Sequence, residues 1–129
     1  MESFRLTKKD VEMLSEKYPT PFVVISLAQV ERNYDFLKRH MPRVNVYYAM
    51  KANPAPRIIE TLARRGASFD TASAGEIETL ARMGIAGTRM IYANPVKTPQ
   101  GLAAAAQFGV RRFTFDDRSE IKKMAEAVP

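Results

Sequence analysis

The stretch that decides the fold reads Val44-Asn45-Val46-Tyr47-Tyr48-Ala49, followed at once by Met50-Lys51-Ala52-Asn53-Pro54. The first part is an apolar run of strand length, and the second places a lysine where that strand ends, just before a helical pattern. In α/β proteins small-molecule sites lie beyond the carboxyl ends of parallel strands. An amine held in such a partly dry site can form a Schiff base with an aldehyde. Taken alone, however, Lys51 also fits a lysine that simply ends a strand and reaches into water.

The same strand-then-helix unit recurs along the chain with an even period. Buried strands are predicted at 44–50, 68–71, 90–93 and 112–115, and their starts are 24, 22 and 22 residues apart. Apolar residues at helical spacing follow each strand, in segments 56–65, 74–83, 99–108 and 119–127. Repeated βα units require a parallel sheet covered by helices. We therefore predict an α/β fold whose parallel (β/α) repeats form about half of a TIM-type barrel, since a complete barrel needs roughly 250 residues.

A helix and a strand are predicted ahead of these repeats. Thr7 begins the helix, with Asp10 placed like the partner in a capping box, and Pro19-Thr20-Pro21 ends it. The segment 22–25 is expected to be a strand, and the segment 28–39 a further helix. The predicted organisation is a single N-terminal portion of a barrel domain over residues 1–129. Within it, residues 1–26 form the N-terminal helix and strand, and residues 27–129 form the βα units.

Polar side chains stand at all four predicted strand ends. They are Lys51, Asp70, Asn94 and the pair Asp116-Asp117. An amine, carboxylates and an amide at consecutive strand ends are typical of the catalytic rim of a (β/α) barrel. Asp and Asn are also ordinary helix caps. The pair Asp116-Asp117, which precedes a helix with Glu120 in its first turn, fits capping better than chemistry.

Composition excludes several classes of protein. The net charge is +6, but the basic pairs are spread over the predicted outer helices without interleaved aromatic residues, so we expect no nucleic-acid partner. No apolar run is long enough to span a bilayer, and the first residues do not resemble a signal peptide, so we expect no membrane association. The chain has no cysteine, which excludes disulfides and thiolate zinc sites and favours a cytoplasmic location. No metal site is predicted.

Two motifs carry a resemblance to a known family. The segments Tyr48-Ala49-Met50-Lys51-Ala52-Asn53 and Phe69-Asp70-Thr71-Ala72-Ser73-Ala74-Gly75-Glu76-Ile77 resemble the signatures of the alanine-racemase-fold (type III) pyridoxal-phosphate decarboxylases. The resemblance runs from about residue 21 to residue 129 and covers the N-terminal half of that family's barrel domain. The segments Ile91-Tyr92-Ala93-Asn94-Pro95-Val96-Lys97 and Phe113-Thr114-Phe115-Asp116-Asp117 are similar to the ornithine and lysine decarboxylase branch, and most of all to the bacterial lysine/ornithine decarboxylase type.

The resemblance implies a cofactor, a reaction and a set of site residues. Lys51 would be the catalytic residue that holds pyridoxal phosphate as a Schiff base, in a carboxy-lyase that converts ornithine to putrescine or lysine to cadaverine for polyamine biosynthesis. Asp70 and Glu76 would lie near the lysine and the cofactor, although both also suit helix capping and first-turn positions. Ala49 would be small because the cofactor packs beside it. Asn94 would be either a hydrogen-bonding residue at the rim or simply a turn residue, and Lys97 is interpreted as a surface charge.

The resemblance also implies parts that lie outside this chain. In the family, the phosphate-binding loops, the partner of the pyridine nitrogen and the residues that bind the substrate's distal amine come later, some from a second subunit, and a C-terminal β-domain follows. We therefore expect a homodimeric parent enzyme. The isolated chain is expected to be inactive and to self-associate through its open sheet edges.

Other interpretations remain open on the sequence. One is a decarboxylase-like regulator without catalysis, although the presence of Lys51, Asp70 and Glu76 weighs against it. Another is an excised half-barrel that serves as a folding unit. A third is a diaminopimelate decarboxylase or alanine racemase of the same fold, which the segment 92–97 makes less favourable.

Overall fold

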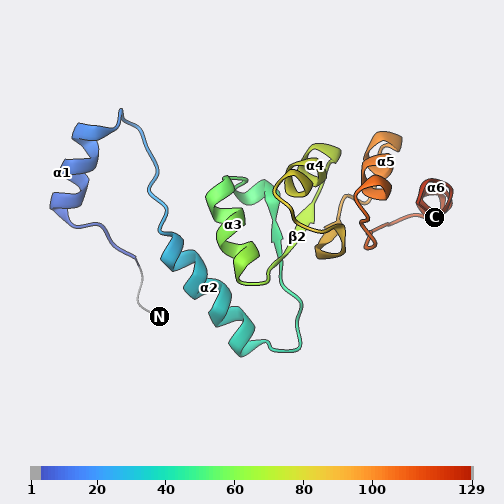
Figure 1. Ribbon diagram of the computed structural model, residues 1–129, viewed down its shortest axis with the longest axis horizontal. Coiled ribbons are helices and arrows are strands. Elements are labelled where there is room, and N and C mark those ends of the chain that lie inside the picture. The colour runs from blue at the N-terminus through green and yellow to red at the C-terminus, as the bar shows by residue number, and fades with distance from the viewer. Residues whose placement is uncertain (1–3, 129) are drawn as a thin grey trace.

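The computed structural model describes residues 4–128 of the 129-residue chain. It consists of short helices that alternate with three short strands (Figure 1). In chain order the elements are α1 (Lys8–Lys17), α2 (Leu27–His40), β1 (Tyr47–Ala49), η1 (Met50–Ala52), α3 (Pro56–Arg64), β2 (Ser68–Thr71), α4 (Ala74–Arg82), η2 (Gly87–Arg89), β3 (Met90–Tyr92), α5 (Pro99–Gln107) and α6 (Arg118–Ala127).

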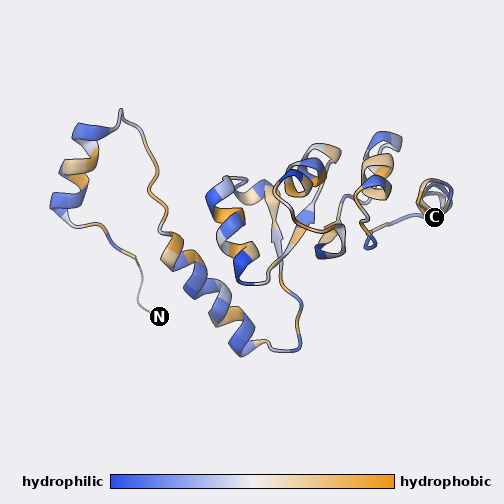
Figure 2. Cartoon of the chain, in the orientation of Figure 1, coloured by the Kyte–Doolittle hydropathy of each residue, from blue (hydrophilic) through white to orange (hydrophobic). Residues whose placement is uncertain are grey.

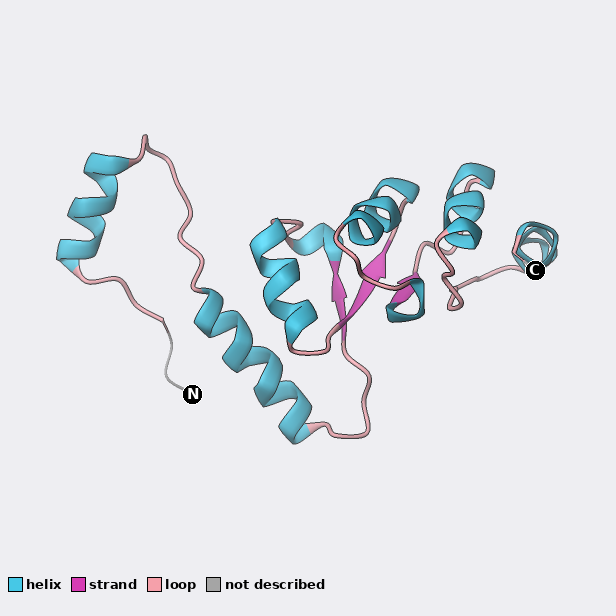
Figure 3. Cartoon of the chain, viewed as in Figure 1, coloured by secondary structure: helices cyan, strands magenta, loops and turns pink. Residues whose placement is uncertain are grey.

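The strands form one parallel sheet in the order β1-β2-β3 (Figure 3). The structure thus confirms the predicted α/β class and its parallel (β/α) repeats. The fourth strand, predicted at 112–115, is reduced to a single parallel bridge between Tyr92 and Phe113. Beyond this bridge the carbonyl of Thr114 accepts a hydrogen bond from the side chain of Lys97, so it is engaged by a side chain rather than by a strand.

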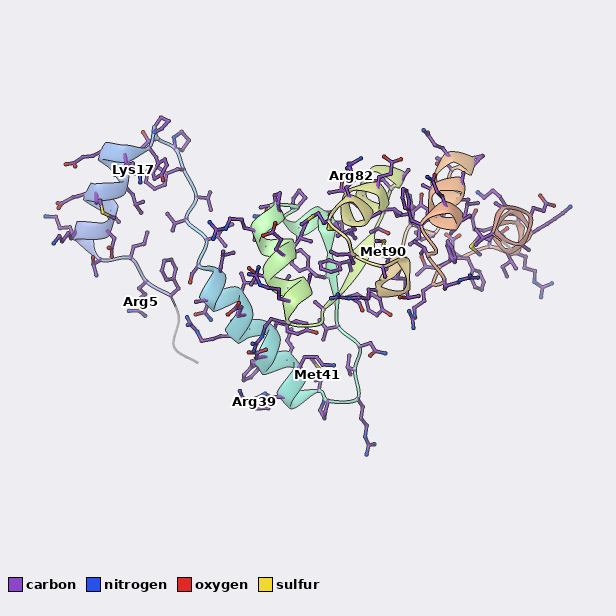
Figure 4. All side chains as sticks on the ribbon, viewed as in Figure 1. Arg5, Lys17, Arg39, Met41, Arg82 and Met90 are labelled. Atoms are coloured by element: carbon purple, nitrogen blue, oxygen red, sulfur yellow. The ribbon has the colours of Figure 1, made fainter. Side chains whose placement is uncertain are left out.

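One face of the sheet is buried under helices and the other is open. In β2, Phe69 and Thr71 are buried while Ser68 and Asp70 are only half-buried. Because side chains alternate across a strand, this pattern separates a helix-covered face from a face that would line the barrel interior. Met90 of β3 is fully buried in the core, whereas Arg82 is exposed on α4 (Figure 4).

The covered face is the hydrophobic core. Its central strand residues, Phe69 and Met90, are fully buried together with residues from the surrounding helices, namely Ile58, Ile59, Leu62, Ile77, Leu80 and Ala105. Each fully buried Leu, Ile, Phe or Met side chain contributes about 1.5–3 kcal/mol relative to exposure. The helices pack in sequence around this core, with α2 against α3, α4 against α5, and α5 against α6. Packing of this kind fixes the carboxyl ends of the strands, where the site residues lie.

Local signals at the helix ends behave as predicted. The glycines that follow α3, α4 and α5 all have positive φ, at 82° for Gly66, 76° for Gly84 and 72° for Gly109. Thr7 and Asp10 form the predicted capping box of α1, and Asp117 caps α6. No helix within residues 4–128 is both long and apolar enough to cross a membrane.

The strand predicted at 22–25 is wrong. This segment is irregular, and Val23 within it is 86% exposed. A strand needs a partner for its backbone N–H and C=O groups, and none of residues 4–128 pairs with this segment. Figure 2 shows the stretch between α1 and α2 as largely hydrophobic, which is why the sequence resembles a strand there.

Candidate cofactor site

Lys51 lies at the carboxyl end of β1, on a short turn that is fixed on both sides. Met50, the preceding residue, is 1% exposed and anchors the turn in the core, whereas the side chain of Lys51 is exposed. The Tyr48 hydroxyl donates a hydrogen bond to the carbonyl of Asn53 at 3.0 Å, and Asn53 Oδ1 accepts one from the Ala55 N–H at 3.0 Å. Burial raises the pKa of Tyr48, which keeps its hydroxyl protonated as a donor. The amine therefore projects from a well-defined position into open space.

Ala49 and Asp70 lie beside each other on the open face of the sheet. The strand register pairs Ala49 with Asp70 and Asp70 with Ile91. Paired residues of neighbouring strands direct their side chains to the same face, about 4.8 Å apart along the hydrogen-bonding direction. The methyl group of Ala49 leaves space next to the Asp70 carboxylate. Lys51 follows in the η1 turn directly after β1, and this turn packs against β2, so the three candidate residues belong to neighbouring strand ends.

Glu76 lies in the first turn of α4, close to the end of β2. Its backbone N–H donates to Ser73 Oγ at 3.3 Å, and its carboxylate accepts a hydrogen bond from the N–H of Ala72 through Oε2. The structure thus shows the capping geometry that was one of the two interpretations from the sequence. The capping bond uses one carboxylate oxygen, so it is compatible with a second contact to a bound molecule.

Asn94 follows β3 and is half-buried. Its side-chain Nδ2 donates to the carbonyl of Ala72 at 3.4 Å. Ala72 therefore bonds to both candidates, with its N–H directed to Glu76 and its C=O to Asn94. The strand ends of β2 and β3 are linked through this one residue.

Lys97 is not the surface charge that the sequence suggested. It is 1% exposed, and its Nζ donates to the carbonyls of Asn94 at 3.1 Å, Pro95 at 3.1 Å and Thr114 at 2.7 Å. The same Nζ lies 3.0 Å from Glu120 Oε1. A lysine between Val96 and Thr98 in a proline-containing loop carries no local signal of burial, because the groups that bury and neutralise it, Thr114 and Glu120, lie far along the chain.

Glu120 is the buried counterpart of Lys97, rather than only a first-turn residue of α6. It is 5% exposed, accepts the Lys97 backbone N–H at 2.9 Å, and pairs with Lys123 Nζ at 2.6 Å. The hydrogen bond from Lys123, together with those from Lys97, lowers the pKa of Glu120 from 4.5 to about 2. The carboxylate is therefore charged and joins the β3–α5 loop to α6. By contrast, Asp116 is exposed and Asp117 serves as a helix cap.

Comparison with known proteins decides the family. Residues 27–129 match the family described as "Pyridoxal-dependent decarboxylase, pyridoxal binding domain". The chain belongs to the pyridoxal-dependent decarboxylases. Pyridoxal phosphate is thus the cofactor of this domain, and the resemblance carried by the motifs around Lys51 and Asp70 is confirmed.

The relatives of this pyridoxal-dependent decarboxylase chain include both enzymes and an inhibitor protein. It is 60% identical over 129 residues to the lysine/ornithine decarboxylase of Selenomonas ruminantium, covering all of this chain and 33% of the relative. A crystal structure of the Selenomonas lysine decarboxylase in complex with pyridoxal phosphate and cadaverine matches with a TM-score of 0.96 at 60% identity, covering all of this chain and 34% of that one. Antizyme inhibitor 2 of Xenopus laevis is 39% identical over 108 residues, covering 84% of this chain and 24% of the relative. The chain spans about a quarter to a third of the length of the relatives it matches.

Proposed function

We propose that this chain is the cofactor-lysine part of a decarboxylase that acts on basic amino acids, converting ornithine to putrescine or lysine to cadaverine. The observation that carries the proposal is the position of Lys51, exposed at the carboxyl end of β1 beside the paired residues Ala49 and Asp70. The 60% identity to a lysine/ornithine decarboxylase supports the substrate class.

The residues at this edge fit the chemistry of pyridoxal phosphate. An accessible primary amine, a small neighbour and a carboxylate lie on one open face, which suits a planar aldehyde with a cationic ring. When bound, the cofactor supplies an electron sink for the charge left when the carboxylate of the substrate departs.

Each residue of the chain then has a distinct task. Lys51 would hold pyridoxal phosphate through its primary amine and would yield that position to the amino group of the substrate. Ala49 leaves room for the ring against the sheet. Asp70 accepts hydrogen bonds and holds positive charge near the displaced amine, and Glu76 adds a second carboxylate at the same rim. Asn94 contributes an amide where β3 ends.

The complete protein, in this proposal, is a cytoplasmic homodimer that works in polyamine biosynthesis, with residues 27–129 as the first βα units of its barrel. The open edge of β1 supports the further proposal that the isolated chain self-associates. A hollow of about 350 Å³ lies beside β1, and most of its lining is apolar or aromatic, including Val30, Leu37, Val46 and Tyr47. Exposed apolar surface next to an unpaired strand edge favours association.

A second candidate is a non-catalytic regulator, and the similarity to antizyme inhibitor 2 is the observation in its favour. The decarboxylase is preferred because Lys51 is accessible and has Ala49 and Asp70 beside it, an arrangement that a protein without the cofactor does not require. A diaminopimelate decarboxylase or alanine racemase is less favoured because the closely similar relative acts, by its name, on lysine and ornithine.

The proposal is tested by placing this chain in the framework of a full-length relative. The corresponding N-terminal segment of the Selenomonas ruminantium enzyme is replaced by this chain, and carbon dioxide release from lysine and ornithine is measured. We expect decarboxylation of at least one substrate, abolished by Lys51→Ala but retained by the surface variant Lys122→Ala. A folded chimera that binds pyridoxal phosphate but releases no carbon dioxide from either substrate would favour the regulator.

A further inference from the structure

Lys97 occupies an unusual position for a charged side chain. Its side chain is fully buried, yet its Nζ meets three backbone carbonyls and the Glu120 carboxylate. Taking a lysine and a glutamate out of water costs several kcal/mol per ion, and an apolar pair of the same volume is often equally stable. The pair therefore calls for an explanation other than stability alone.

The contacts of Lys97 lead from α6 towards the rim of the candidate site. Two of its carbonyl partners, Asn94 and Pro95, lie in the loop that follows β3, and the third, Thr114, lies just past the bridge to β3. The ammonium group thus holds the backbone carbonyl of Asn94, while the Asn94 side chain donates a hydrogen bond to the carbonyl of Ala72.

This network continues to a carboxylate of the proposed cofactor site. The N–H of Ala72 donates to Glu76, so an unbroken series of hydrogen bonds runs from Glu120 through Lys97, Asn94 and Ala72 to Glu76. The buried ammonium holds the Asn94 carbonyl in one position, because moving this carbonyl away would leave the buried charge without a hydrogen-bond partner.

We infer that Lys97 is a positioning residue for the cofactor rim: it fixes the Asn94 loop against Ala72 and thereby holds Asn94 and Glu76 in the geometry that receives pyridoxal phosphate. The inference rests on the proposed function, because it assigns Lys97 to the same site. Lys97 itself acts only through the loop.

The test compares Lys97→Met with a matched control, Lys123→Met. Both variants remove a cation from the same Glu120 carboxylate. Lys123 donates to the carbonyl of Lys97 itself, whereas the carbonyls of Asn94, Pro95 and Thr114 are bonded by Lys97. The first measurement is the ¹⁵N NMR signal of the Asn94 side-chain amide in the chain without cofactor. The second is the affinity for pyridoxal phosphate, measured from the absorbance of its Schiff base with Lys51 at a temperature where circular dichroism shows each variant folded.

We expect Lys97→Met to shift the Asn94 amide signal and to weaken cofactor binding at least tenfold, while Lys123→Met leaves the signal in place and the affinity within twofold. If Lys97→Met does not fold, the double variant Lys97→Met/Glu120→Gln removes the unpaired carboxylate and takes its place in both measurements. An unchanged Asn94 signal, or affinity losses in both variants that follow their melting temperatures, would overturn the inference. If the parent chain forms no Schiff base at Lys51, cofactor binding requires the rest of the barrel, the chimera tests the proposed function, and the Asn94 signal decides whether Lys97 positions the loop.

Discussion

Ala49 and Asp70 are paired neighbours on β1 and β2, and both face the side of the sheet that the helices leave open. Ala49 has the smaller side chain, and the exposed Lys51 follows in the turn beyond the end of β1. The pairing of Ala49 with Asp70 thus defines the part of the open face where the planar cofactor is proposed to bind.

Enlarging Ala49 should block the cofactor without unfolding the chain. Ala49→Leu adds bulk to a half-exposed face, where a substitution typically changes stability by less than about 0.5 kcal/mol. We expect the affinity for pyridoxal phosphate to fall at least tenfold while the melting temperature is nearly unchanged, as measured by absorbance titration and circular dichroism. Ile91→Leu, on the same face but one strand further away, is the control and should bind as the parent does. Equal binding by all three proteins would show that the cofactor does not pack on Ala49.

Glu120 should make stability depend on pH in acid. Its pKa is lowered from 4.5 to about 2 in the folded chain, principally by the hydrogen bond from Lys123. A lowered carboxyl pKa means that the unfolded state binds the proton more readily, so the stabilisation is complete above about pH 4.5 and is lost as the pH falls towards 2.

Urea unfolding of the parent and of Glu120→Gln between pH 6 and pH 2.5 measures this effect. The parent should lose stability more steeply than the variant across that range, and the two curves should converge at the acid end. Parallel curves would contradict the charged state of the buried carboxylate.

Gly101 should not tolerate a side chain. A Cβ at this position would lie 2.2 Å from the Tyr92 hydroxyl oxygen and 3.0 Å from its Cζ, and Tyr92 is 2% exposed. We expect Gly101→Ala to destabilise the chain by about 1–3 kcal/mol, the usual cost of overpacking a core. Gly75→Ala, also near the start of a helix but with nothing within 4 Å of the added Cβ, is the matched control and should stabilise by up to about 1 kcal/mol. Denaturant unfolding gives both values, and equal signs for the two substitutions would refute this packing.

Self-association should depend on the open edge beside β1. Tyr47 lines the hollow next to this strand, and a charge at a sheet edge opposes pairing with another chain. Sedimentation velocity of the parent should show a mass that rises with concentration, and Tyr47→Lys should shift the distribution towards the monomer. A parent that sediments as a monomer at all concentrations would exclude association through this edge.

The sequence predicts those features of the fold that local signals encode. Strands lie at 47–49, 68–71 and 90–92, within or at the predicted ranges, because apolar runs mark the strands and glycines mark the ends of α3, α4 and α5. The cap at Asp117 and the exit of Lys51 from β1 follow from the same short-range pattern.

Features that depend on partners distant in the sequence were not predicted. The apolar segment 22–25 has strand composition but no strand beside it within the described residues, and 112–115 pairs along one side through a single bridge. The burial of Lys97 depends on Glu120, which is 23 positions further along the chain and belongs to another helix. No pattern around either residue indicates that the two meet.

The central claim, that Lys51 is the cofactor lysine, is tested most directly by trapping. The chain is incubated with pyridoxal phosphate, reduced with borohydride, digested and mapped by mass spectrometry. We expect the reduced cofactor on Lys51, and we expect Lys51→Arg to remove the label. Label spread over exposed lysines such as Lys8 and Lys122, with Lys51 no more modified than these, would contradict it.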